Sequence, residues 1–489
     1  MKKRIAQILI VIFLLISFAL TISVQWLYES FGNLSMDEII FHLKVPMEGT
    51  NTDMVWKYMQ QCLWKIIILT IIVSIILIYP ITKNLQTISK KGRTVFVSLC
   101  ISIIILGASM TNVVQATQIG EYIENQKNNS QFIANEYVNP KEVNIEFPEE
   151  KRNLIYIFLE SMETTYYSKN DGGLSETDLI PEISKIAKEN LNFSNTTQLG
   201  GAHTLYGTTW TAGAMTAQTA GVPLKLSVDA NALSEYSVFL GGAYGIGEVL
   251  EDNGYHNFLL LGSDAIFGGR KNLFTQHGNY EIWDVECAVA ENRITEKIWW
   301  GYSDDNLFKF AKEKILKLAE QVEPFNFTML TVDTHFTDGY LCEDCPNKWD
   351  EQYKNVISCS SQKVGEFIEW IKKQEFYENN TIVISGDHLT MQPNFFELAE
   401  GQDYEKKVVN MIINSGVEPE NTSRVYSTFD LYPTTLVAMG AKIEGNRLAL
   451  GTNLFSDELT LIEKYGLEYV NEELMKTSKF YNNNILVSN

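Results

Sequence analysis

The chain has 489 residues, 45% of them hydrophobic, and a formal net charge of -21 at pH 7. This length allows one large domain or two to three smaller ones, together with membrane segments. Binding to a nucleic-acid backbone requires a basic surface, so the acidic balance argues against a nucleic-acid partner.

Three apolar runs lie near the N-terminus. Residues 5–24 carry no charged side chain, and two further apolar runs cover about residues 63–81 and 94–114. Each run is long enough to cross a bilayer as a helix. We therefore predict a membrane anchor with three transmembrane helices over residues 1–114. A signal peptide cleaved near Ser23 is the alternative for the first run.

Basic residues predict the orientation of these spans. Lys2, Lys3 and Arg4 precede the first run. The short connection between the second and third runs contains Lys83, Lys90, Lys91 and Arg93. Such clusters stay on the cytoplasmic side of a membrane. With three crossings, the chain after about Val114 then lies outside the cytoplasm, attached to the cell membrane as a multi-pass protein.

The remaining chain divides into a linker, a large domain and a tail. Residues 115–151 are polar and rich in Asn and Glu, which is typical of an extracytoplasmic linker. In residues 152–460, apolar runs such as "LIYIFL", "NFLLLG", "FNFTMLTV", "TIVIS" and "VVNMII" alternate with amphipathic segments such as "PEISKIAKENL", "DNLFKFAKEKILKLAEQV" and "SSQKVGEFIEWIKKQ". This alternation predicts an α/β fold with a mostly parallel sheet between helices. Residues 461–489 are predicted to form a C-terminal tail.

Six cysteines are present, and two of them form a C-x-x-C pair in "LCEDCPNKWD". This spacing is compatible with zinc binding, redox chemistry or a disulfide. No second pair follows at the spacing of a zinc site, and a location outside the cytoplasm favours a structural disulfide, with unpaired thiols as the alternative.

Three predicted strands end in polar residues able to bind a metal. Glu160 follows the first strand, Asp333, Thr334 and His335 follow "FTMLTV", and Asp387 and His388 follow "TIVIS". Each ending alone is compatible with an ordinary surface acid or turn. Together they would meet at one edge of a parallel sheet and supply oxygen and nitrogen ligands for a divalent metal such as manganese or zinc.

A threonine-rich segment offers a nucleophile. In "GGAHTLYGTTWTAGAMTAQTAGVPL", small residues of helical character follow Thr208, Thr209 and Thr211. A threonine at a helix N-terminus would lie beside free backbone N–H groups that bind a phosphoryl oxygen. The alternative is that one of these threonines only caps the helix.

The order of the motifs resembles a known family. "NLIYIFLES", "YGTTWTAGAM", "TVDTHF", "VISGDH" and "STFDLYPTTL" occur as in membrane-anchored phosphoglycerol transferases of the lipoteichoic acid synthase and glucan phosphoglycerol transferase type. These enzymes belong to the sulfatase/alkaline-phosphatase superfamily. The resemblance covers about residues 153–455 and implies a sulfatase-like catalytic domain over residues 152–460.

The resemblance also implies roles for individual residues. Thr208, seven positions before Met215, corresponds to the nucleophile and would also bind the metal. Manganese is the implied metal, with zinc and magnesium as alternatives. Glu160, Asp387 and His388 correspond to metal ligands of the family. Arg270 and His335 correspond to substrate-binding residues.

The implied activity is transfer of phosphoglycerol from phosphatidylglycerol to an extracytoplasmic polysaccharide or glycolipid, through a glycerophosphoryl-threonine intermediate. The alternatives are a phosphoethanolamine transferase and a catalytically silent envelope receptor. The chain departs from the lipoteichoic acid synthases at Gly268, where those enzymes have a tryptophan, and in having three spans rather than five. It also lacks the Cys/Ser-x-Pro-x-Arg motif of true sulfatases. Trp299, Trp300 and Tyr302 either stack against a sugar acceptor or pack as loop anchors.

Overall fold

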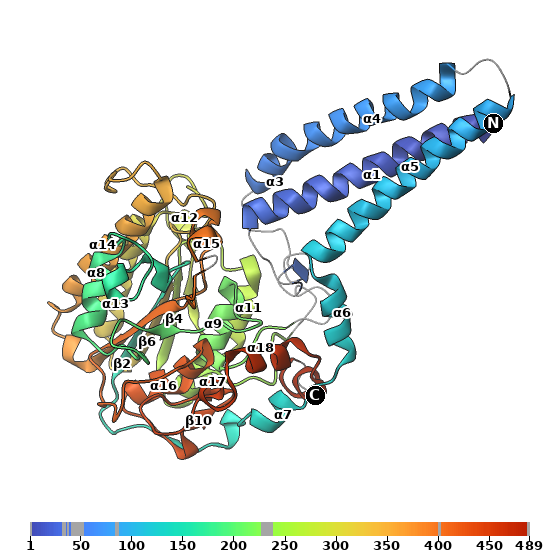
Figure 1. Cartoon of the computed structure of the whole chain (residues 1–489). Helices are drawn as coiled ribbons and strands as arrows, with labels where there is room; N and C mark the ends of the chain where they lie inside the picture. Colours follow the sequence, from blue (N-terminus) through green and yellow to red (C-terminus); the bar gives the residue numbers. More distant parts are fainter. Residues whose placement is uncertain are drawn as a thin grey trace. The chain divides into compact units, whose positions relative to one another are not determined.

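Figure 1 shows a computed structural model of the chain, which describes residues 2–31, 36, 39–40, 53–83, 88–225, 238–399 and 402–486. The chain divides into two compact units. Of the described residues, 2–31, 36, 53–83 and 88–124 belong to the first unit, and 39–40 and those from Asn125 onward belong to the second.

Three long apolar helices make up most of the first unit. They are α1 (Lys2–Phe31), α4 (Trp64–Lys83) and α5 (Ile88–Ala116), and α4 continues from α3 (Asp53–Tyr58) through the π-helical turn η1 (Met59–Leu63). Within the described residues, three segments are long and apolar enough to cross a membrane: Arg4–Ser30, Val55–Ile81 and Arg93–Ala116. The prediction of three apolar N-terminal helices is therefore confirmed.

The helices of this unit are apolar on their outer as well as their inner surfaces. Ile10, Leu14 and Ile81 are buried between helices, whereas Ile75 and Ile104 are exposed. Helices that are hydrophobic all round are typical of membrane spans. Small polar side chains join the helices at few points, as where Thr21 Oγ1 donates to Ser109 Oγ at 2.9 Å. Such contacts are common between membrane helices.

The second unit is built on a seven-stranded sheet with strand order β3-β8-β7-β2-β6-β4-β5. β2, β4, β5, β6 and β7 run parallel, whereas β8 is antiparallel to β7 and β3 is antiparallel to β8. The strands are β2 (Asn153–Leu159), β3 (Gly201–Ala202), β4 (His256–Leu261), β5 (Glu281–Trp283), β6 (Phe325–Leu330), β7 (Asn380–Gly386) and β8 (Val408–Ile413). The predicted, mostly parallel α/β sheet is confirmed.

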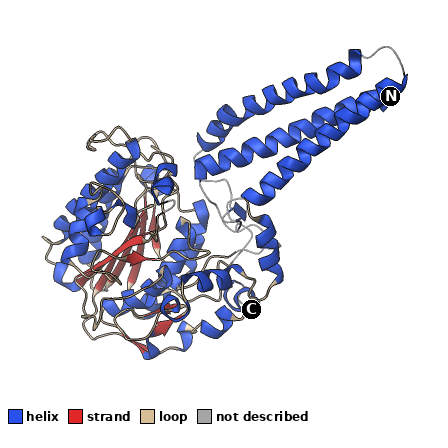
Figure 2. Cartoon of the chain, in the orientation of Figure 1, coloured by secondary structure: helices blue, strands red, loops and turns tan. Residues whose placement is uncertain are grey.

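Helices cover both faces of this sheet (Figure 2). Alternate residues of β2 explain why its apolar run is continuous: Tyr156 and Phe158 pack in one core, and Ile155 and Ile157 pack in the other. The first core includes residues of α9 (Thr211–Ala220), α10 (Ile246–Asp252), α11 (Arg270–Gln276) and α16 (Leu431–Ala438). The second includes residues of the predicted helices, α8 (Pro181–Glu189), α13 (Asp304–Ala319) and α14 (Gln352–Ile371), and of α12 (Val285–Ala290).

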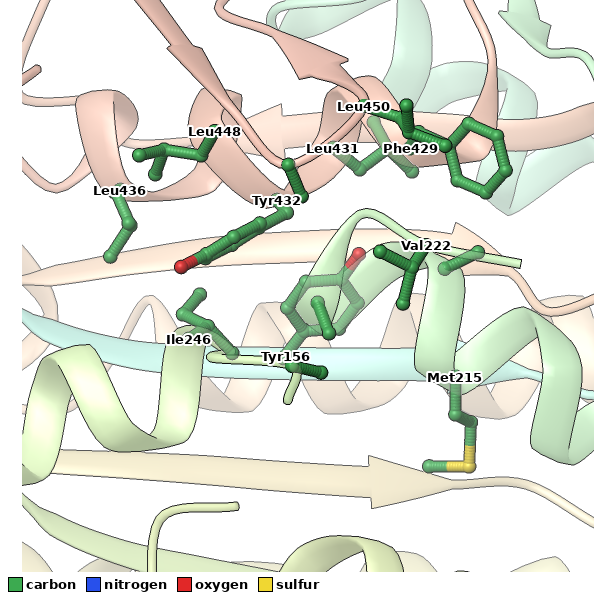
Figure 3. Packing of buried hydrophobic residues seen from close by; sticks show 14 of the residues in the cluster. Tyr156, Met215, Val222, Ile246, Phe429, Leu431, Tyr432, Leu436, Leu448 and Leu450 are labelled. Carbon is green, nitrogen blue, oxygen red and sulfur yellow. The ribbon is translucent and has the colours of Figure 1, made fainter. Parts of the chain in front are cut away.

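The first core fixes the helix that carries the threonine-rich segment. Figure 3 shows Tyr156 of β2, Met215 of α9 and Tyr432 of α16 among the buried side chains of this core. The hydroxyl of Tyr156 donates to Oε1 of Gln218 on α9 at 2.9 Å, and Nε2 of Gln218 donates to the carbonyl of Gly386 at 3.0 Å. Because all these groups are buried, α9 is held in register with the middle of β2 and the end of β7.

The segments that flank the sheet also pack on this unit. Phe132 and Ile133 are buried before β2, and Ile485 is buried near the C-terminal end of the described chain. The predicted boundaries at residues 114, 151 and 460 stay predictions. The other short elements are α6 (Ile119–Lys127), which contains the boundary between the two units, and α7 (Phe132–Glu136), β1 (Ile145–Glu146), α15 (Pro393–Ala399), β9 (Lys442–Ile443), β10 (Arg447–Leu448), β11 (Gly451–Thr452), α17 (Leu461–Tyr465), α18 (Leu467–Met475) and α19 (Lys479–Tyr481).

One disulfide lies between the loop after β6 and α14. It joins Cys345 to Cys359, 14 positions apart. Sγ of Cys342 lies 2.6 Å from Sγ of Cys345 and 3.8 Å from Sγ of Cys359. The predicted disulfide therefore involves Cys345, but its partner is Cys359 rather than the other cysteine of the C-x-x-C pair.

Candidate metal and catalytic site

The carboxyl ends of β2, β6 and β7 bring the predicted site residues to one edge of the sheet. In the parallel register, Leu159 of β2 pairs with Gly386 of β7, and Phe158 pairs with Leu330 of β6. Glu160 and Asp387 follow their strands directly, and His335 follows β6 in the next loop. Ligands of α/β sheets bind at this edge.

Glu160, Asp387 and His388 form a compact, fully buried cluster. Nε2 of His388 lies 3.4 Å from Oε1 of Glu160 and 3.5 Å from Oδ2 of Asp387. One oxygen or nitrogen from each side chain lies within 4.8 Å of the others. The structure therefore brings together the three residues that were predicted as metal ligands.

Short hydrogen bonds hold the two carboxylates in place. The hydroxyl of Ser161 donates to Oε1 of Glu160 at 2.8 Å, and its backbone N–H donates to Oδ1 of Asp387 at 2.8 Å. Thr331 Oγ1 accepts from the backbone N–H of Glu160, and Thr334 Oγ1 donates to its carbonyl. The strand ends and the first residues of the loops thus fix the cluster before any ligand binds.

The burial of two neighbouring carboxylates shifts their pKa values. Burial and the charge of Glu160 raise the pKa of Asp387 to about 7. Burial opposes ionisation of Glu160 as well, but His388 and His335 outweigh it and hold its pKa at about 2. Burial disfavours the charged form of His388, but Asp387 and Glu160 outweigh it and raise its pKa to about 10. The cluster is therefore a place where positive charge is stabilised.

The donor set fits a divalent metal. Oδ2 of Asp387 is buried and has no hydrogen-bond partner among the described residues, although a buried carboxylate oxygen normally has one. Nδ1 of His388 faces the carbonyl of Leu389 at 2.8 Å, so a neutral ring donates there and leaves the lone pair of Nε2 facing the carboxylates. Two carboxylates and one imidazole suit manganese or zinc.

The threonine that reaches this cluster is Thr211 rather than Thr208. Oγ1 of Thr211 lies 3.4 Å from Nε2 of His388 and 3.5 Å from Oε2 of Glu160. Thr208 is fully buried, and its hydroxyl donates to the carbonyl of Leu205 and accepts from the N–H of Leu205, both at 2.8 Å. The role predicted for Thr208 is therefore corrected, because its hydroxyl closes a turn and is already satisfied on both sides.

The local sequence explains why the prediction fell on Thr208, three positions before Thr211. Thr211 is the first residue of α9, and its N-cap is Trp210, which makes no side-chain capping bond. Thr208 and Thr209 look like better caps than a tryptophan does, so the sequence places the start of the helix too early. At its true start, α9 directs its unpaired backbone N–H groups and the positive end of its dipole toward the region of Thr211.

Arg270 is a buried cation at the start of α11. Its Nε donates to the carbonyl of Phe267 at 3.0 Å, and its Nη2 donates to the carbonyl of Asp264 at 2.7 Å. No described residue accepts a hydrogen bond from Nη1, so that nitrogen is available to a ligand. Burial lowers the pKa of Arg270 to about 10, with the charges of Glu160 and Asp264 acting against this shift, so the guanidinium stays charged at neutral pH.

The two ionisable residues of the "DTH" motif have different surroundings. The ring of His335 lies 4.6 Å from the ring of Trp300, and Nδ1 of His335 is 2.8 Å from the carbonyl of Phe336. Burial lowers the pKa of His335, with Glu160 acting in the opposite direction, so the imidazole is neutral near pH 7. Oδ2 of Asp333 instead lies 3.2 Å from Nζ of Lys363. Asp333 therefore belongs to a separate ion network.

The comparison with known families agrees with this arrangement. Residues 152–441, more than half of the chain, match the family described as Sulfatase. The chain belongs to the sulfatase family. Its α/β unit, which contains the matched residues, has a mostly parallel central sheet.

Relatives of this sulfatase-family chain include proteins named phosphoglycerol transferase I. The one from Escherichia coli (strain 55989 / EAEC) is 29% identical over 327 residues, covering 65% of this chain and 41% of that protein. The one from Citrobacter koseri is 32% identical over 272 residues, covering 54% of this chain and 34% of that protein. The matched region thus spans less than half the length of these curated relatives.

Among solved structures, the lipoteichoic acid synthase LtaP from Listeria monocytogenes is 19% identical, with a TM-score of 0.49 over 67% of this chain and 81% of that chain. The Streptococcus pyogenes phosphoglycerol transferase GacH is 15% identical, with a TM-score of 0.43 over 73% of this chain and 89% of that chain. The C-terminal periplasmic domain of EcEptC from Escherichia coli is 14% identical, with a TM-score of 0.42 over 63% of this chain and 88% of that chain.

Several residues that support the sulfatase-family site carry no clear signal in the sequence. Ser161 donates a hydrogen bond to Asp387 and Gln218 donates one to the carbonyl of Gly386, and neither belongs to a recognisable metal-binding pattern. The position of Ser161 directly after Glu160 is the one signal that points to it, because a small hydroxyl residue beside a buried acid can hold its carboxylate.

Proposed function

We propose that this chain is a phosphoglycerol transferase. It moves the glycerophosphoryl group of phosphatidylglycerol to a hydroxyl of an extracytoplasmic polysaccharide or glycolipid. The position of the Thr211 hydroxyl, 3.4 Å from His388 and 3.5 Å from Glu160, carries the proposal. The relatives named phosphoglycerol transferase I support the choice of the transferred group.

Thr211 is the proposed nucleophile. Its Oγ1 loses its proton and forms a bond to the phosphorus of the donor, while the bond from phosphorus to the diacylglycerol oxygen breaks and that oxygen takes up a proton, leaving a glycerophosphoryl-threonine and free diacylglycerol. The acceptor hydroxyl then attacks this phosphorus, and Oγ1 of Thr211 leaves and takes up a proton, which restores the threonine. His335 is neutral at pH 7 and is suited to take the proton of the acceptor hydroxyl in this second step.

Positive groups around the phosphorus would stabilise the charge that develops there. Nη1 of Arg270 and the N-terminus of α9 are suited to bind its non-bridging oxygens. The loss of one such donor typically raises the barrier by about 3 kcal/mol. Glu160, Asp387, His388 and Thr211 would hold a divalent cation, most simply manganese, which would lower the pKa of the threonine hydroxyl and withdraw charge from the phosphoryl group.

The apolar helices of the first unit fit this function as a membrane anchor. The basic residues beside the spans favour a multi-pass arrangement with the second unit outside the cytoplasm. An anchor would keep the site at the membrane that contains its donor and raise the effective concentration of phosphatidylglycerol. Phosphatidylglycerol and an envelope glycan or glycolipid are then the proposed partners.

The test uses the full-length chain purified in detergent. Fluorescent phosphatidylglycerol and phosphatidylethanolamine are supplied separately, with and without manganese, and released diacylglycerol is measured. We expect manganese-dependent release from phosphatidylglycerol, and a loss of more than about 10³-fold in Thr211→Ala. Thr208→Ala is the matched control, and we expect it to keep its rate within a few fold while losing about 1 kcal/mol of stability.

The outcomes separate the alternatives. Release from phosphatidylethanolamine alone would replace the proposal by a phosphoethanolamine transferase with the same nucleophile. A rate lost in Thr208→Ala and kept in Thr211→Ala would show that the nucleophile is assigned wrongly. Manganese binding without release from either lipid, also in the presence of glycan acceptors, would favour a silent receptor.

A further inference from the structure

Two tryptophans form the tip of a tight hairpin between β5 and α13. The N–H of Ile298 donates to the carbonyl of Gly301 at 2.7 Å, and the N–H of Gly301 donates to the carbonyl of Ile298 at 2.9 Å. Trp299 and Trp300 are the two residues of the turn, and Trp299 has a φ of 59°. Glycine or asparagine normally occupies this position, and a bulky residue there is strained. Such strain often marks a functional site.

The hairpin is fixed to the carboxyl end of β4. The N–H of Tyr302 donates to the carbonyl of Gly262 at 2.9 Å, and the Tyr302 hydroxyl donates to the carbonyl of Leu261 at 2.7 Å. A Cβ atom at Gly301 would lie only 2.0 Å from the carbonyl oxygen of Gly262. The two backbones are therefore in close contact, and the tryptophans are held at the same edge of the sheet as the metal cluster.

Trp300 continues an aromatic wall that borders the candidate site. Its ring centre lies 4.6 Å from that of His335 and 5.3 Å from that of Phe267. The guanidinium carbon of Arg270 lies 5.6 Å from the centre of the Phe267 ring. The wall thus runs from the proposed phosphate-binding arginine, through Phe267 and Trp300, to the proposed proton acceptor.

Core packing and polar anchoring do not explain the two tryptophans. Neither belongs to the hydrophobic cores of the second unit, and both side chains are partly exposed. Neither indole N–H has a hydrogen-bond partner among the described residues. Trp283 shows the contrasting case, because it is buried and its Nε1 donates to Glu291 at 2.9 Å.

We propose that the Trp299–Trp300 hairpin is the acceptor subsite and that it binds a neutral pyranose ring against the face of Trp300. This inference rests on the proposed transfer reaction. The apolar C–H face of a sugar ring packs on an aromatic face, while its hydroxyl groups stay in water. A ring on Trp300 lies beside His335, the residue suited to take the proton of the attacking hydroxyl.

The surroundings of the hairpin favour a sugar over a lipid chain. Glu296 and Lys297 precede the turn and are exposed, and Lys297 pairs with Glu286. An acyl chain requires a continuous apolar groove, whereas a flat aromatic surface with a charged rim suits a polar ring. The proposed binding site of the donor phosphate, at Thr211 and Arg270, lies at the other end of the wall.

The experiment measures how the glycerophosphoryl group divides between a sugar and water. The full-length chain in detergent receives fluorescent phosphatidylglycerol and manganese with cellotriose or maltotriose. Glycerophosphoryl-sugar and free glycerol phosphate are then quantified by mass spectrometry. We expect the ratio of transfer to hydrolysis to fall at least 10-fold in Trp300→Ala, with a raised KM for the sugar, and to fall less in Trp300→Phe.

A second readout is independent of turnover. Binding of the same sugars to Thr211→Ala is measured by titration calorimetry without lipid, with and without Trp300→Phe or Trp300→Ala. We expect at least 10-fold weaker binding in the alanine variant. Trp370→Ala is the matched control, because Trp370 packs on Phe367 near the end of α14 and before the start of β7, at the opposite edge of the sheet.

The two readouts separate this inference from the proposed function. If the chain cleaves the donor, but sugar transfer or sugar binding is the same with and without Trp300, the subsite is overturned and the proposed function stands. An equal loss of transfer and hydrolysis, with sugar binding unchanged, would assign Trp300 to the donor and also overturn the subsite. Trp300-dependent sugar binding without cleavage of any donor would overturn the transferase and support the subsite.

Discussion

Nζ of Lys363 on α14 lies 3.2 Å from Oδ2 of Asp333, in the loop that carries His335. Asp304 accepts from the backbone N–H of Val332 at 2.8 Å and also faces the N–H of Asp333. Burial opposes the charge of Lys363, but Asp333 and Asp304 outweigh it and raise its pKa above the usual range. One buried cation thus balances two carboxylates that fix the start of the His335 loop.

We expect Lys363→Met to destabilise the chain by about 3 kcal/mol at pH 7.5, because it leaves buried carboxylates without a counter-charge. Burial raises the pKa of Asp304 to about 6, and burial with the charge of Asp304 raises that of Asp333 further above its usual value. Asp304 and Asp333 therefore bind protons as the pH falls from 7.5 through about 6, which removes the uncompensated charge, so the loss relative to the wild type should shrink over this interval.

Chemical denaturation of the full-length chain in detergent measures this loss. The control is Lys309→Met on α13, because Lys309 is exposed and makes no ion pair among the described residues. A deficit of the same size at pH 4 and pH 7.5 would show that lost packing, rather than uncompensated charge, causes the effect.

Metal binding should depend on the glycine before Asp387. A Cβ atom at Gly386 would lie 2.0 Å from the carbonyl oxygen of Met162, so Gly386→Ala must displace the strand end that positions Asp387. We expect manganese to raise the melting temperature of the wild type, since a ligand at 100 times its Kd adds about 2.7 kcal/mol. We expect Gly386→Ala to lose most of this shift.

Differential scanning fluorimetry with a manganese titration tests this expectation without any assay of activity. Gly120→Ala on α6 is the matched control, because an added Cβ there meets no heavy atom within 4 Å. A full manganese shift in Gly386→Ala would show that the metal site tolerates displacement of this strand end, or lies elsewhere.

Asp430 should contribute a measurable pH dependence of stability. It is fully buried before α16, where it accepts from the N–H of Ser427 at 2.7 Å and from the N–H of Thr452 at 2.8 Å. Burial outweighs these bonds and raises its pKa to about 6. The folded state therefore keeps this proton to a higher pH than the unfolded state does, and stability falls by about 3 kcal/mol as the pH rises from about 4 to above 6.

This contribution appears as the difference between the wild type and Asp430→Asn, measured from the free energy of unfolding at several pH values. Asparagine does not titrate, so the wild type should lose stability relative to the variant across that interval. A constant difference from pH 4 to pH 7 would mean that Asp430 has the same pKa in the folded and unfolded states.

The sequence predicts the sheet well where apolar runs are continuous. β2, β4, β6, β7 and β8 are buried on both faces, so their residues form runs that need no alternation. The short strands β3 and β5 have two and three residues and leave no such pattern. Their pairing is determined by neighbouring strands that lie far away in the sequence.

The site likewise contains residues that the sequence predicts and residues whose positions depend on tertiary packing. Glu160, Asp387 and His388 were predictable because each follows a recognisable strand, and parallel strands place their ends together. Thr211 was not, because three threonines occur within four positions and tertiary packing decides where α9 begins. The contact between Trp300 and His335 was equally inaccessible, since it depends on how β4 and the hairpin before α13 meet.

The three clustered cysteines support a last prediction. Sγ of Cys342 lies close enough to the Cys345–Cys359 disulfide to replace Cys359 as the partner of Cys345. We expect the oxidised wild type to contain the Cys345–Cys359 bond with Cys342 as a free thiol. In Cys359→Ser, Cys342 and Cys345 should pair instead. Peptide mapping by mass spectrometry after alkylation without reduction distinguishes these states.

The two pairings should differ in stability because they close loops of different length. The native bond restrains a 14-residue separation and should contribute about 3 kcal/mol, whereas a C-x-x-C bond closes a much shorter loop. Cys359→Ser should therefore unfold more easily than Cys342→Ser, which keeps the native bond. Burial raises the pKa of Cys342, so exchange in the wild type should be slower at pH 7 than at pH 9, where more thiolate is present. Equal stability of the two serine variants would show that the native bond adds nothing to the fold.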